Sequence, residues 1–456
     1  MESPQLREMI NFSRRARFED IEPATIDQLK KHILDSIGSL IFSLKQEVPK
    51  KLMRQVAKIE EETGIIPIHQ LTVDRLAELY TALIRYPDFM DNFLGKHATC
   101  HPSDNLGVLL AAGRHKKASG QQFLKAMAIA YQLICRLTEK FPVMTKGFDH
   151  TVLLNFSAMI GVAEILGLSK EETRHACGMV GCTVNPLVTL RASYTSEWKG
   201  FASSCTAFNC INKAYLAMEG MTGPYSIFEG PMAMNKVMEM ELVHNWNHEE
   251  EFELIKRCIL KSYNSEVHSQ SLVEGILELA QQNNIDVLLV KEIKATTFLT
   301  AYHIIGGGEY GDRKVVVNKE QADHSLPYLL AVALLDKQVY PEQFSIDRIN
   351  SADVQELLKK VEVTTSFPLK EPRKIVSKLD SYTEAYPDKM MGKIEIRTND
   401  DKKFEIEKED YAGFFTRPME WEKVQEKFKR LTSGIITDAQ QQKVISTVME
   451  DRKSVV

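Results

Sequence analysis

Residues 152–172 read VLLNFSAMIGVAEILGLSKEE, and this stretch decides what kind of fold the chain forms. Apolar residues occupy nearly every position up to Leu166, so a helix here has no polar face and must be buried on all sides. Gly167 is suited to end that helix, and Ser169 with Glu172 forms a capping box for the next one. The stretch therefore predicts a buried helix followed closely by a second helix.

Two further capping boxes extend this pattern toward the N-terminus. Thr25 and Gln28 precede an apolar stripe at helical spacing, made up of Ile26, Leu29, Ile33, Leu34, Ile37, Leu40 and Ile41. Ser119 and Gln122 open an apolar segment that continues to about Leu137, and Gly113 is expected to end the helix before it. Boxes at this spacing predict a mainly α protein.

The pattern changes after about residue 260. Residues 285–295 mix β-branched and apolar side chains, as in a strand, and residues 326–335 are again helical in character. Residues 393–397 (KIEIR) and 403–407 (KFEIE) alternate with period two around a polar turn, which predicts a hairpin. From Met419 onward the pattern is helical again. We therefore expect a large all-α helical domain formed by residues 1–260 and 413–456, with a smaller α+β domain inserted at 261–412.

Composition narrows the classes of function. Hydrophobic residues make up 44% of the chain and charged residues 26%, with a formal net charge of -5. So mild an acidic excess argues against nucleic acid as a partner, although a pocket for a small anion needs only a local positive field. No apolar run is long enough to span a membrane, and residues 1–20 resemble neither a signal peptide nor a transit peptide. The seven cysteines form no CxxC pair, so we expect reduced thiols in a cytoplasmic protein.

Residues 97–107 (HATCHPSDNLG) form the most unusual polar stretch. His97 and His101 have the spacing of a zinc-binding helix, but Pro102 would end such a helix at once and no glutamate lies between them. We therefore expect no metal here. Ser103 or Asp104 is expected to cap a helix that runs to about Ala112, with His101 just before its start.

Other polar residues interrupt apolar helices further along the chain. His150 precedes the buried helix, Lys199 stands among small residues where a helix N-terminus would favour an anion, and Lys261 precedes a group of tyrosine and histidine residues. Residues 306–311 (GGGEYG) lack the strand–turn–helix context of a dinucleotide site, so we expect a flexible loop. The residues alone predict a pocket of His, Lys, Arg and Asp for a small polyanion, without fixing the reaction.

Seven short segments, taken in their order along the chain, resemble the motifs of a known family. They are residues 33–38 (ILDSIG), 88–91 (DFMD), 101–107 (HPSDNLG), 148–150 (FDH), 190–191 (LR) with Lys199, Lys261 with 268–270 (HSQ), and 323–328 (DHSLPY). Together they resemble motifs of the MmgE/PrpD family, which includes 2-methylcitrate dehydratase and cis-aconitate decarboxylase. The resemblance covers essentially the whole chain.

The resemblance implies a helical domain with an α+β lid, a site between the two, a homodimer, and no metal or organic cofactor. It also implies a tricarboxylate substrate, whose carboxylates need fixed cations. The implied catalytic residues are Asp88, His101, His150, Lys199 and Lys261. The implied substrate-binding residues are Asp91, Ser103, Arg191, Tyr263, His268 and Tyr328.

Dehydration of such a substrate needs a group that removes a proton beside a carboxylate and a group that protonates the leaving hydroxyl. His101 and His150 titrate in the right range for both tasks, and which one serves as acid stays open. Asp88 either acts as a base or orients a histidine. The lysines would stabilise the charge that develops on the carboxylate.

Several functions remain open on this scaffold. The HPSDNLG and FDH segments favour a dehydratase acting on 2-methylcitrate, citrate or a relative. The alternatives are decarboxylation of cis-aconitate to itaconate and epimerisation of a diacid. A non-enzymatic paralogue that binds a polycarboxylate is also open, because residues 88–100 depart from the family pattern, for example at Asn92, where threonine is common.

Overall fold

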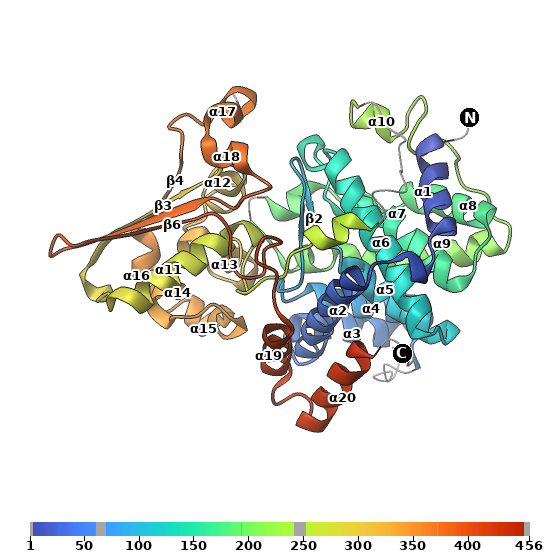
Figure 1. Cartoon of the computed structure of the whole chain (residues 1–456), viewed down its shortest axis with the longest axis horizontal. Coiled ribbons are helices and arrows are strands. Elements are labelled where there is room, and N and C mark those ends of the chain that lie inside the picture. The colour runs from blue at the N-terminus through green and yellow to red at the C-terminus, as the bar shows by residue number, and fades with distance from the viewer. Residues whose placement is uncertain (1–2, 61–69, 193, 241–251, 372, 451–456) are drawn as a thin grey trace. The chain divides into compact units, whose positions relative to one another are not determined.

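The computed structural model describes residues 3–60, 70–192, 194–240, 252–371 and 373–450 (Figure 1). The chain divides into two compact units, the first formed by residues 1–188, 200–259 and 420–456, and the second by residues 189–199 and 260–419.

This division differs from the predicted boundaries in two segments. Residues 189–199 were expected in the helical domain but belong to the second unit, where the Thr195 hydroxyl donates to the carbonyl of Glu320 at 2.8 Å. Residues 413–419 also stay in the second unit, since the carbonyl of Gly413 accepts from the amide of Leu260 at 3.0 Å. Both assignments rest on contacts with distant parts of the chain, which local sequence patterns do not report.

The first unit consists almost entirely of helices, which confirms the mainly α prediction. Its helices are α1 (Pro4–Arg15), α2 (Pro23–Ser43), α3 (Glu47–Glu60), α4 (Val73–Arg85), α5 (Asp104–Lys116), α6 (Gly120–Lys140), α7 (Thr151–Leu166), α8 (Lys170–Gly181), α9 (Ala202–Met218), α10 (Met234–Val237), α19 (Trp421–Thr432) and α20 (Asp438–Met449). A two-stranded ladder of β1 (Phe93–Leu94) and β2 (Thr99–Cys100) lies before α5.

No helix among the described residues is both long enough and apolar enough to cross a membrane.

Helix α7 is the buried helix that the opening stretch predicts. Its side chains from Thr151 to Ala163 are all buried, and α5, α6, α8 and α9 pack around it. The capping boxes at Ser119 and Ser169 are both formed, with the serine hydroxyl accepting from the amide three residues on. Gly167 ends α7 in the left-handed conformation (φ 77°), as expected for a residue without a Cβ atom.

Two predicted helix ends are wrong. Helix α2 begins at Pro23, whose fixed φ angle suits the first helical position, so Thr25 is already inside the first turn and caps nothing. Helix α5 does not stop at Gly113 but continues to Lys116 and ends where Lys117 takes a left-handed conformation (φ 54°). The added residues Arg114, His115 and Lys116 are exposed and basic, and basic side chains suit the last turn of a helix, where the helix dipole is negative.

The second unit is built on a four-stranded sheet in the order β4-β3-β5-β6. Its strands are β3 (Val290–Thr297), β4 (Val361–Thr365), β5 (Gly392–Thr398) and β6 (Lys403–Lys408). Strands β5 and β6 form the predicted hairpin, with Ile394 opposite Ile406. The strand predicted from residue 285 begins only at Val290, because residues 287–289 form a 3-10 turn that the Asp286 side chain caps. Strand β4, which pairs in parallel with β3, was not predicted.

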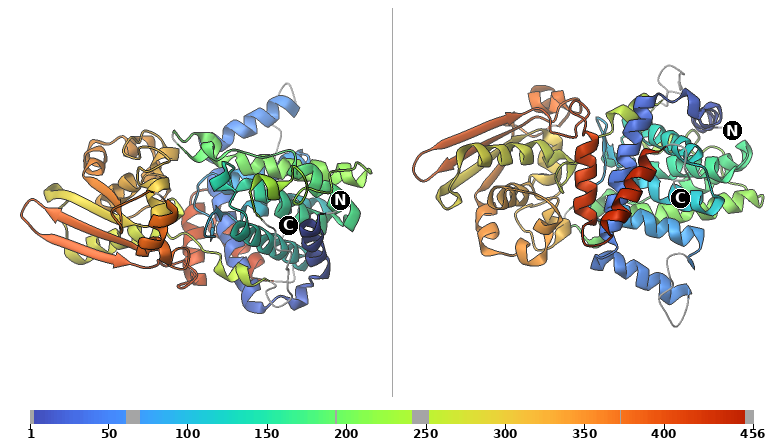
Figure 2. Two further views of the ribbon diagram at one scale, coloured as in Figure 1. Left: turned by 90° about the horizontal axis from the view of Figure 1, so that it is seen from above. Right: turned by 60° about the horizontal axis from the view of Figure 1, so that its bottom comes forward.

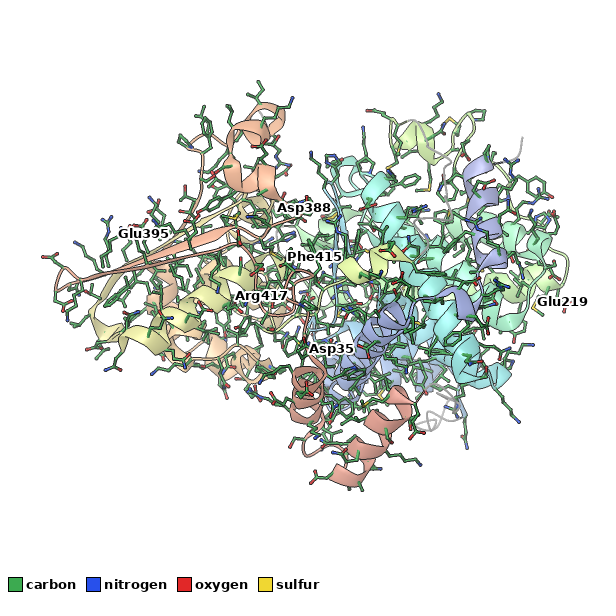
Figure 3. The ribbon with its side chains drawn as sticks, in the orientation of Figure 1. Asp35, Glu219, Asp388, Glu395, Phe415 and Arg417 are labelled. Carbon is green, nitrogen blue, oxygen red and sulfur yellow. The ribbon has the colours of Figure 1, made fainter. Side chains whose placement is uncertain are left out.

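Helices complete the second unit (Figures 1 and 2). They are α11 (Gln270–Asn283), α12 (Leu299–Ile305), α13 (Lys319–Ala322), α14 (Leu326–Asp336), α15 (Ile346–Ile349), α16 (Ala352–Lys359), α17 (Arg373–Leu379) and α18 (Ser381–Ala385). Helix α11 packs closely on β5 and β6: a Cβ atom at Gly275 would lie 3.2 Å from the side chain of Ile406. Arg417 joins this helix to the segment after β6, since its guanidinium bonds Glu274 at 2.6 Å (Figure 3).

The last two helices return to the first unit, as the helical pattern after Met419 predicts. Helices α19 and α20 both pack against α2 (Figure 2). Lys427 of α19 lies 2.7 Å from the carboxylate of Asp35, a residue at the centre of α2 (Figure 3), and also donates to the carbonyl of Phe89 at 2.6 Å. Burial raises the pKa of Asp35, and the charge of Lys427 opposes that rise. The buried Lys427 thus connects α19 to α2 and to the backbone of Phe89.

Replacing Lys427 should therefore destabilise the protein strongly. Lys427→Met removes the cation and leaves the Asp35 charge buried, which costs about 3–5 kcal/mol. We expect the midpoint of thermal unfolding, measured by calorimetry, to fall, and adding Asp35→Asn to the same variant should restore part of it. Lys423→Met, on the exposed face of the same helix, is the control and should change stability by less than about 0.5 kcal/mol. A Lys427→Met protein that unfolds at the wild-type temperature would contradict the assignment.

Candidate active-site clusters

Asp91 connects the core of the first unit to its polar residues. One carboxylate oxygen accepts from Nδ1 of His32 at 2.9 Å and from the hydroxyl of Tyr131 at 2.8 Å. The other accepts from the backbone amide of Ser103 at 3.0 Å. Ser103 occupies the N-cap position of α5, but its side chain forms no capping hydrogen bond, so the predicted side-chain cap is not formed. Because both oxygens already have donors, the geometry favours a positioning role for Asp91 over the predicted substrate-binding role.

His101 is oriented by the backbone of the same residue. Its Nδ1 lies 2.7 Å from the carbonyl oxygen of Asp91. A carbonyl only accepts, so Nδ1 carries the proton, and the lone pair of the neutral ring is on Nε2. The His101 carbonyl in turn accepts from the amide of Asp104 at the start of α5. The ring is thus held at a helix N-terminus with Nε2 as its basic nitrogen.

His150 lies beside His101, as the prediction of a shared site requires. The two ring centroids are 5.4 Å apart, and His150 occupies the residue before α7. Its Nδ1 is 3.6 Å from the carboxylate of Asp149, and its Nε2 is 3.9 Å from that of Asp104. Asp149 is itself held by the amide and hydroxyl of Thr151 at 3.1 and 2.8 Å.

Asp88 is linked to the histidines through Arg85. It adopts a left-handed backbone conformation (φ 56°), which is uncommon for a residue with a Cβ atom and is often found at functional sites. Arg85 Nη1 donates to its carboxylate at 3.1 Å, and Arg85 Nε lies 3.8 Å from Asp104. We call the set Arg85, Asp88, His101, Asp104, Asp149 and His150 the histidine cluster.

His97 and His101 have the i, i+4 spacing of a zinc-binding helix, but they do not lie on a helix. His97 is exposed in the loop between β1 and β2, and His101 follows β2, so the two are not on one helix face. The zinc-helix geometry weighed for this segment is therefore not formed.

The second unit gathers a different set of charges. Lys199 Nζ lies 2.6 Å from the Asp323 carboxylate, and Lys319 Nζ lies 3.0 Å from its other oxygen. His324 Nδ1 is 2.7 Å from Asp323 and 3.2 Å from Lys199 Nζ. Although burial opposes it, the charge of Lys199, followed by those of Lys319 and His324, holds the pKa of Asp323 well below its usual range.

Glu266 continues this set toward Lys261. Its amide donates to the Asp323 carbonyl at 2.9 Å, and its carboxylate lies 2.8 Å from Nδ1 of His268. Burial would raise the pKa of Glu266, but the charges of His268, His324 and Lys261 hold it below its usual range. Burial lowers the pKa of Arg313, which Glu266 and Asp323 counteract.

We call this set the cationic cluster. It includes four cationic side chains, two carboxylates and two histidines: Lys199, Lys261, Arg313, Lys319, Glu266, Asp323, His268 and His324. The four cations give the set positive groups that can pair with an anion carrying more than one negative group.

Some predicted substrate-binding residues face other partners. The Tyr328 hydroxyl donates to the carbonyl of Gln343, and this buried phenol belongs to the packing of α14. Tyr263 interacts electrostatically with Glu274, Glu278 and Arg417 rather than with the cationic cluster. His268 contacts Glu266 through Nδ1 and the Tyr386 hydroxyl through Nε2 at 3.1 Å, so it positions rather than binds. The carbonyl of the buried Arg191 accepts from Arg313 at 3.4 Å.

Sequence reasoning missed the residues that orient the predicted ones. They are His32, Arg85, Tyr131, Asp149, Glu266, Arg313 and Lys319. The part that Asp104 and Asp323 play in the two clusters was missed as well. Asp104, Asp149 and Asp323 stood inside quoted motifs, which was the available signal. Glu266 also lies within a polar stretch that was singled out, between Lys261 and His268, while the others stand outside these motifs.

The sequence matches the MmgE/PrpD N-terminal domain over residues 7–243 and the MmgE/PrpD C-terminal domain over residues 263–451. The chain belongs to the MmgE/PrpD family, as the seven segments predicted.

Relatives with assigned names include 2-methylcitrate dehydratase of Escherichia coli K12, 27% identical over 321 residues, which are 66% of each chain. A probable 2-methylcitrate dehydratase of Saccharomyces cerevisiae is 27% identical over 370 residues, covering 74% of this chain and 69% of the yeast protein. The mitochondrial 2-methylcitrate dehydratase of Yarrowia lipolytica is 26% identical over 359 residues, covering 72% and 66%. The chain therefore spans slightly less than two thirds of the E. coli and Y. lipolytica proteins.

The hydrogen bonds of Asp91 predict a graded effect on stability. Asp91→Asn keeps one acceptor oxygen but places an amide group against donors, so it should cost about 2–4 kcal/mol. Tyr131→Phe removes a single bond and should cost about 1 kcal/mol. Thermal unfolding measures both, and Asp20→Asn, at an exposed carboxylate, should be nearly silent. Equal effects of the two core variants would show that Asp91 is not the shared acceptor.

Proposed function

We propose that the protein is a hydro-lyase that dehydrates a tricarboxylate of the 2-methylcitrate class. The observation that carries this proposal is the pair of histidine rings with centroids 5.4 Å apart, one held as a base by a carbonyl and the other flanked by carboxylates. The names of the relatives support the same class of reaction, and the cationic cluster supplies charge for a polycarboxylate.

The two histidines take different roles in this proposal. His101 is the base, because its Nδ1 proton is committed to the Asp91 carbonyl and Nε2 is left as the basic nitrogen. His150 is the acid, because Asp104 and Asp149 lie within 4 Å of its two nitrogens and stabilise the charged ring. Arg85 lies 3.8 Å from Asp104 and also bonds Asp88, so one guanidinium holds both carboxylates near that ring.

The reaction then needs two proton transfers. His101 Nε2 takes the proton from the carbon next to a substrate carboxylate, and the electron pair left behind forms the carbon–carbon double bond. The carbon–oxygen bond on the neighbouring carbon breaks as His150 gives its proton to the departing hydroxyl, which leaves as water. The negative charge that grows on the carboxylate during proton removal needs a cation to stabilise it, and Lys199 and Lys261 are the residues that the family resemblance implies for this task. No cofactor is needed in this scheme.

Variants at the two clusters should lose turnover without losing the fold. His101→Gln should lower kcat by about 10²–10⁴-fold, as expected for loss of a general base, and Lys199→Met should raise KM as well as lower kcat. Rates are followed by the absorbance of the alkene product. The controls are His115→Gln, on the same helix as Asp104, and Lys291→Met, on an exposed position of β3. Full activity in either cluster variant would reject that residue's assignment.

A substrate panel separates dehydration from the other activities. The protein is incubated with 2-methylcitrate, citrate and cis-aconitate, and products are identified by mass spectrometry together with carbon dioxide release. We expect water loss from 2-methylcitrate or citrate without carbon dioxide. Carbon dioxide from cis-aconitate without any hydration chemistry would make the protein a decarboxylase, and thermal stabilisation by these acids without turnover would make it a binding protein.

The remaining expectations, from composition and from the family resemblance, stay predictions. These are homodimer formation, a cytoplasmic location, a lid role for the second unit and the absence of a nucleic acid partner. Sedimentation or light scattering of the purified protein tests the first of them directly.

A further inference from the structure

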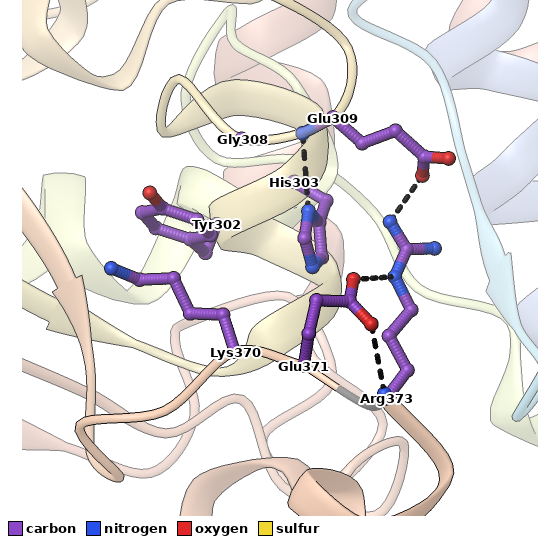
Figure 4. A pocket seen from close by; sticks show the side chains of 7 residues that line it. All are labelled: Tyr302, His303, Gly308, Glu309, Lys370, Glu371 and Arg373. Carbon is purple, nitrogen blue, oxygen red and sulfur yellow. Dashed lines mark hydrogen bonds and ion pairs between the residues drawn. The ribbon is translucent and has the colours of Figure 1, made fainter.

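The second unit contains a cavity of about 650 Å³ that includes none of the predicted site residues. Its lining comes entirely from this unit: Tyr302, His303, Gly308, Glu309, Lys370, Glu371 and Arg373 (Figure 4). It lies where α12 ends in the GGGEYG loop, the motif that the catalytic proposal leaves without a role.

His303 has a defined proton arrangement in this cavity. The residue is 9% exposed, and its Nδ1 accepts from the backbone amide of Glu309 at 3.1 Å. An amide only donates, so the neutral ring carries its proton on Nε2. Burial, and then the charge of Arg373, lowers the pKa of His303, which favours this neutral form. Nε2 is shielded from solvent and has no hydrogen-bond partner among the described residues, so this donor stays unsatisfied unless a ligand group enters beside it.

The glycines of the loop make room for this arrangement. A Cβ atom at Gly308 would lie 2.7 Å from Nδ1 of His303 and 3.0 Å from the ring of Tyr302. A Cβ atom at Gly306 would lie 2.8 Å from the side chain of Val363. The loop therefore depends on glycine to pass this close to His303 and Tyr302.

The charges around His303 are unevenly paired. Arg373 lies between Glu309 and Glu371 and ion-pairs with both, so its charge is balanced (Figure 4). Lys370 lies on the other side of His303, where its ammonium is 4.6 Å from the centroid of the Tyr302 ring. A ring contact satisfies a cation only weakly, so Lys370 keeps most of its capacity to attract an anion.

We propose that this cavity is a second anion site, in which a carboxylate or phosphate group accepts from Nε2 of His303 and pairs with Lys370. The site beside His303 has a place for one oxyanion group, whereas the cationic cluster has the charge for several. The ligand of this second site is therefore a small acid or a phosphate compound. The proposal does not depend on the catalytic one, because it uses no residue of either cluster.

Binding is tested on the full-length protein with succinate and inorganic phosphate as separate probes. Histidine ring nitrogens are observed by ¹⁵N NMR, and the His303 signals are assigned from their loss in His303→Phe. We expect an Nε2-protonated ring whose signals shift on titration with one of the probes, and the tighter probe identifies the oxyanion. His303→Phe and Lys370→Met should each weaken this binding by about tenfold or more.

Variants at other lysines test whether the binding of the probe is specific to this site. Lys291→Met removes an exposed lysine of the same unit and should leave the binding unchanged. Lys199→Met should lower turnover but leave the binding of the probe unchanged, which separates this site from the catalytic clusters. If His303→Phe does not fold, the His303 signals are assigned from their loss in His303→Gln, and Lys370→Met with the wild-type titration gives the result. The proposal is overturned if neither probe shifts the His303 signals, or if binding persists undiminished in Lys370→Met.

Discussion

The first unit depends on one buried carboxylate. Asp91 is fully buried, and an ionised group in that position costs several kcal/mol unless donors surround it. Its donors come from α2, from α6 and from the start of α5, so three elements must be correctly packed before the charge is satisfied. The carbonyl of the same residue orients His101. The geometry of the proposed base is therefore set by core packing and not by a loop, which gives it the rigidity that proton transfer requires.

Helix starts bring the histidine cluster together. His101 stands just before α5 and His150 just before α7, and these helices pack side by side. The hydroxyl of Ser157 on α7 donates to the Asn105 side chain on α5 at 2.9 Å, and that side chain donates to the carbonyl of Pro102 at 2.9 Å. On the other side of α5, a Cβ atom at Gly107 would lie 2.3 Å from the backbone of Thr81 on α4. Close helix packing and a short polar chain thus determine the distance between the two rings.

Much of the fold was predictable because its signals are local. Capping boxes at Ser119 and Ser169, the apolar run of α7 and the alternating hairpin strands each depend on residues within a few positions. The predictions failed where the deciding partner is distant. Asp91 satisfies the amide of Ser103 from twelve residues away in sequence, and residues 189–199 join the second unit through Glu320 and Asp323. The motif residues of the candidate site were found in the same local way, while Arg85 and Tyr131, which hold Asp88 and Asp91, carry no local signal.

Shared carboxylates fix the side chains of the cationic cluster. Asp323 forms ion pairs with Lys199 and Lys319, and the charges of His268, His324 and Lys261 hold the pKa of Glu266 below its usual range. Breaking one such buried pair leaves an uncompensated charge in the interior, which is costly. The ammonium groups are therefore held at defined positions within the second unit, and a fixed position is what recognition of a carboxylate by a cation requires.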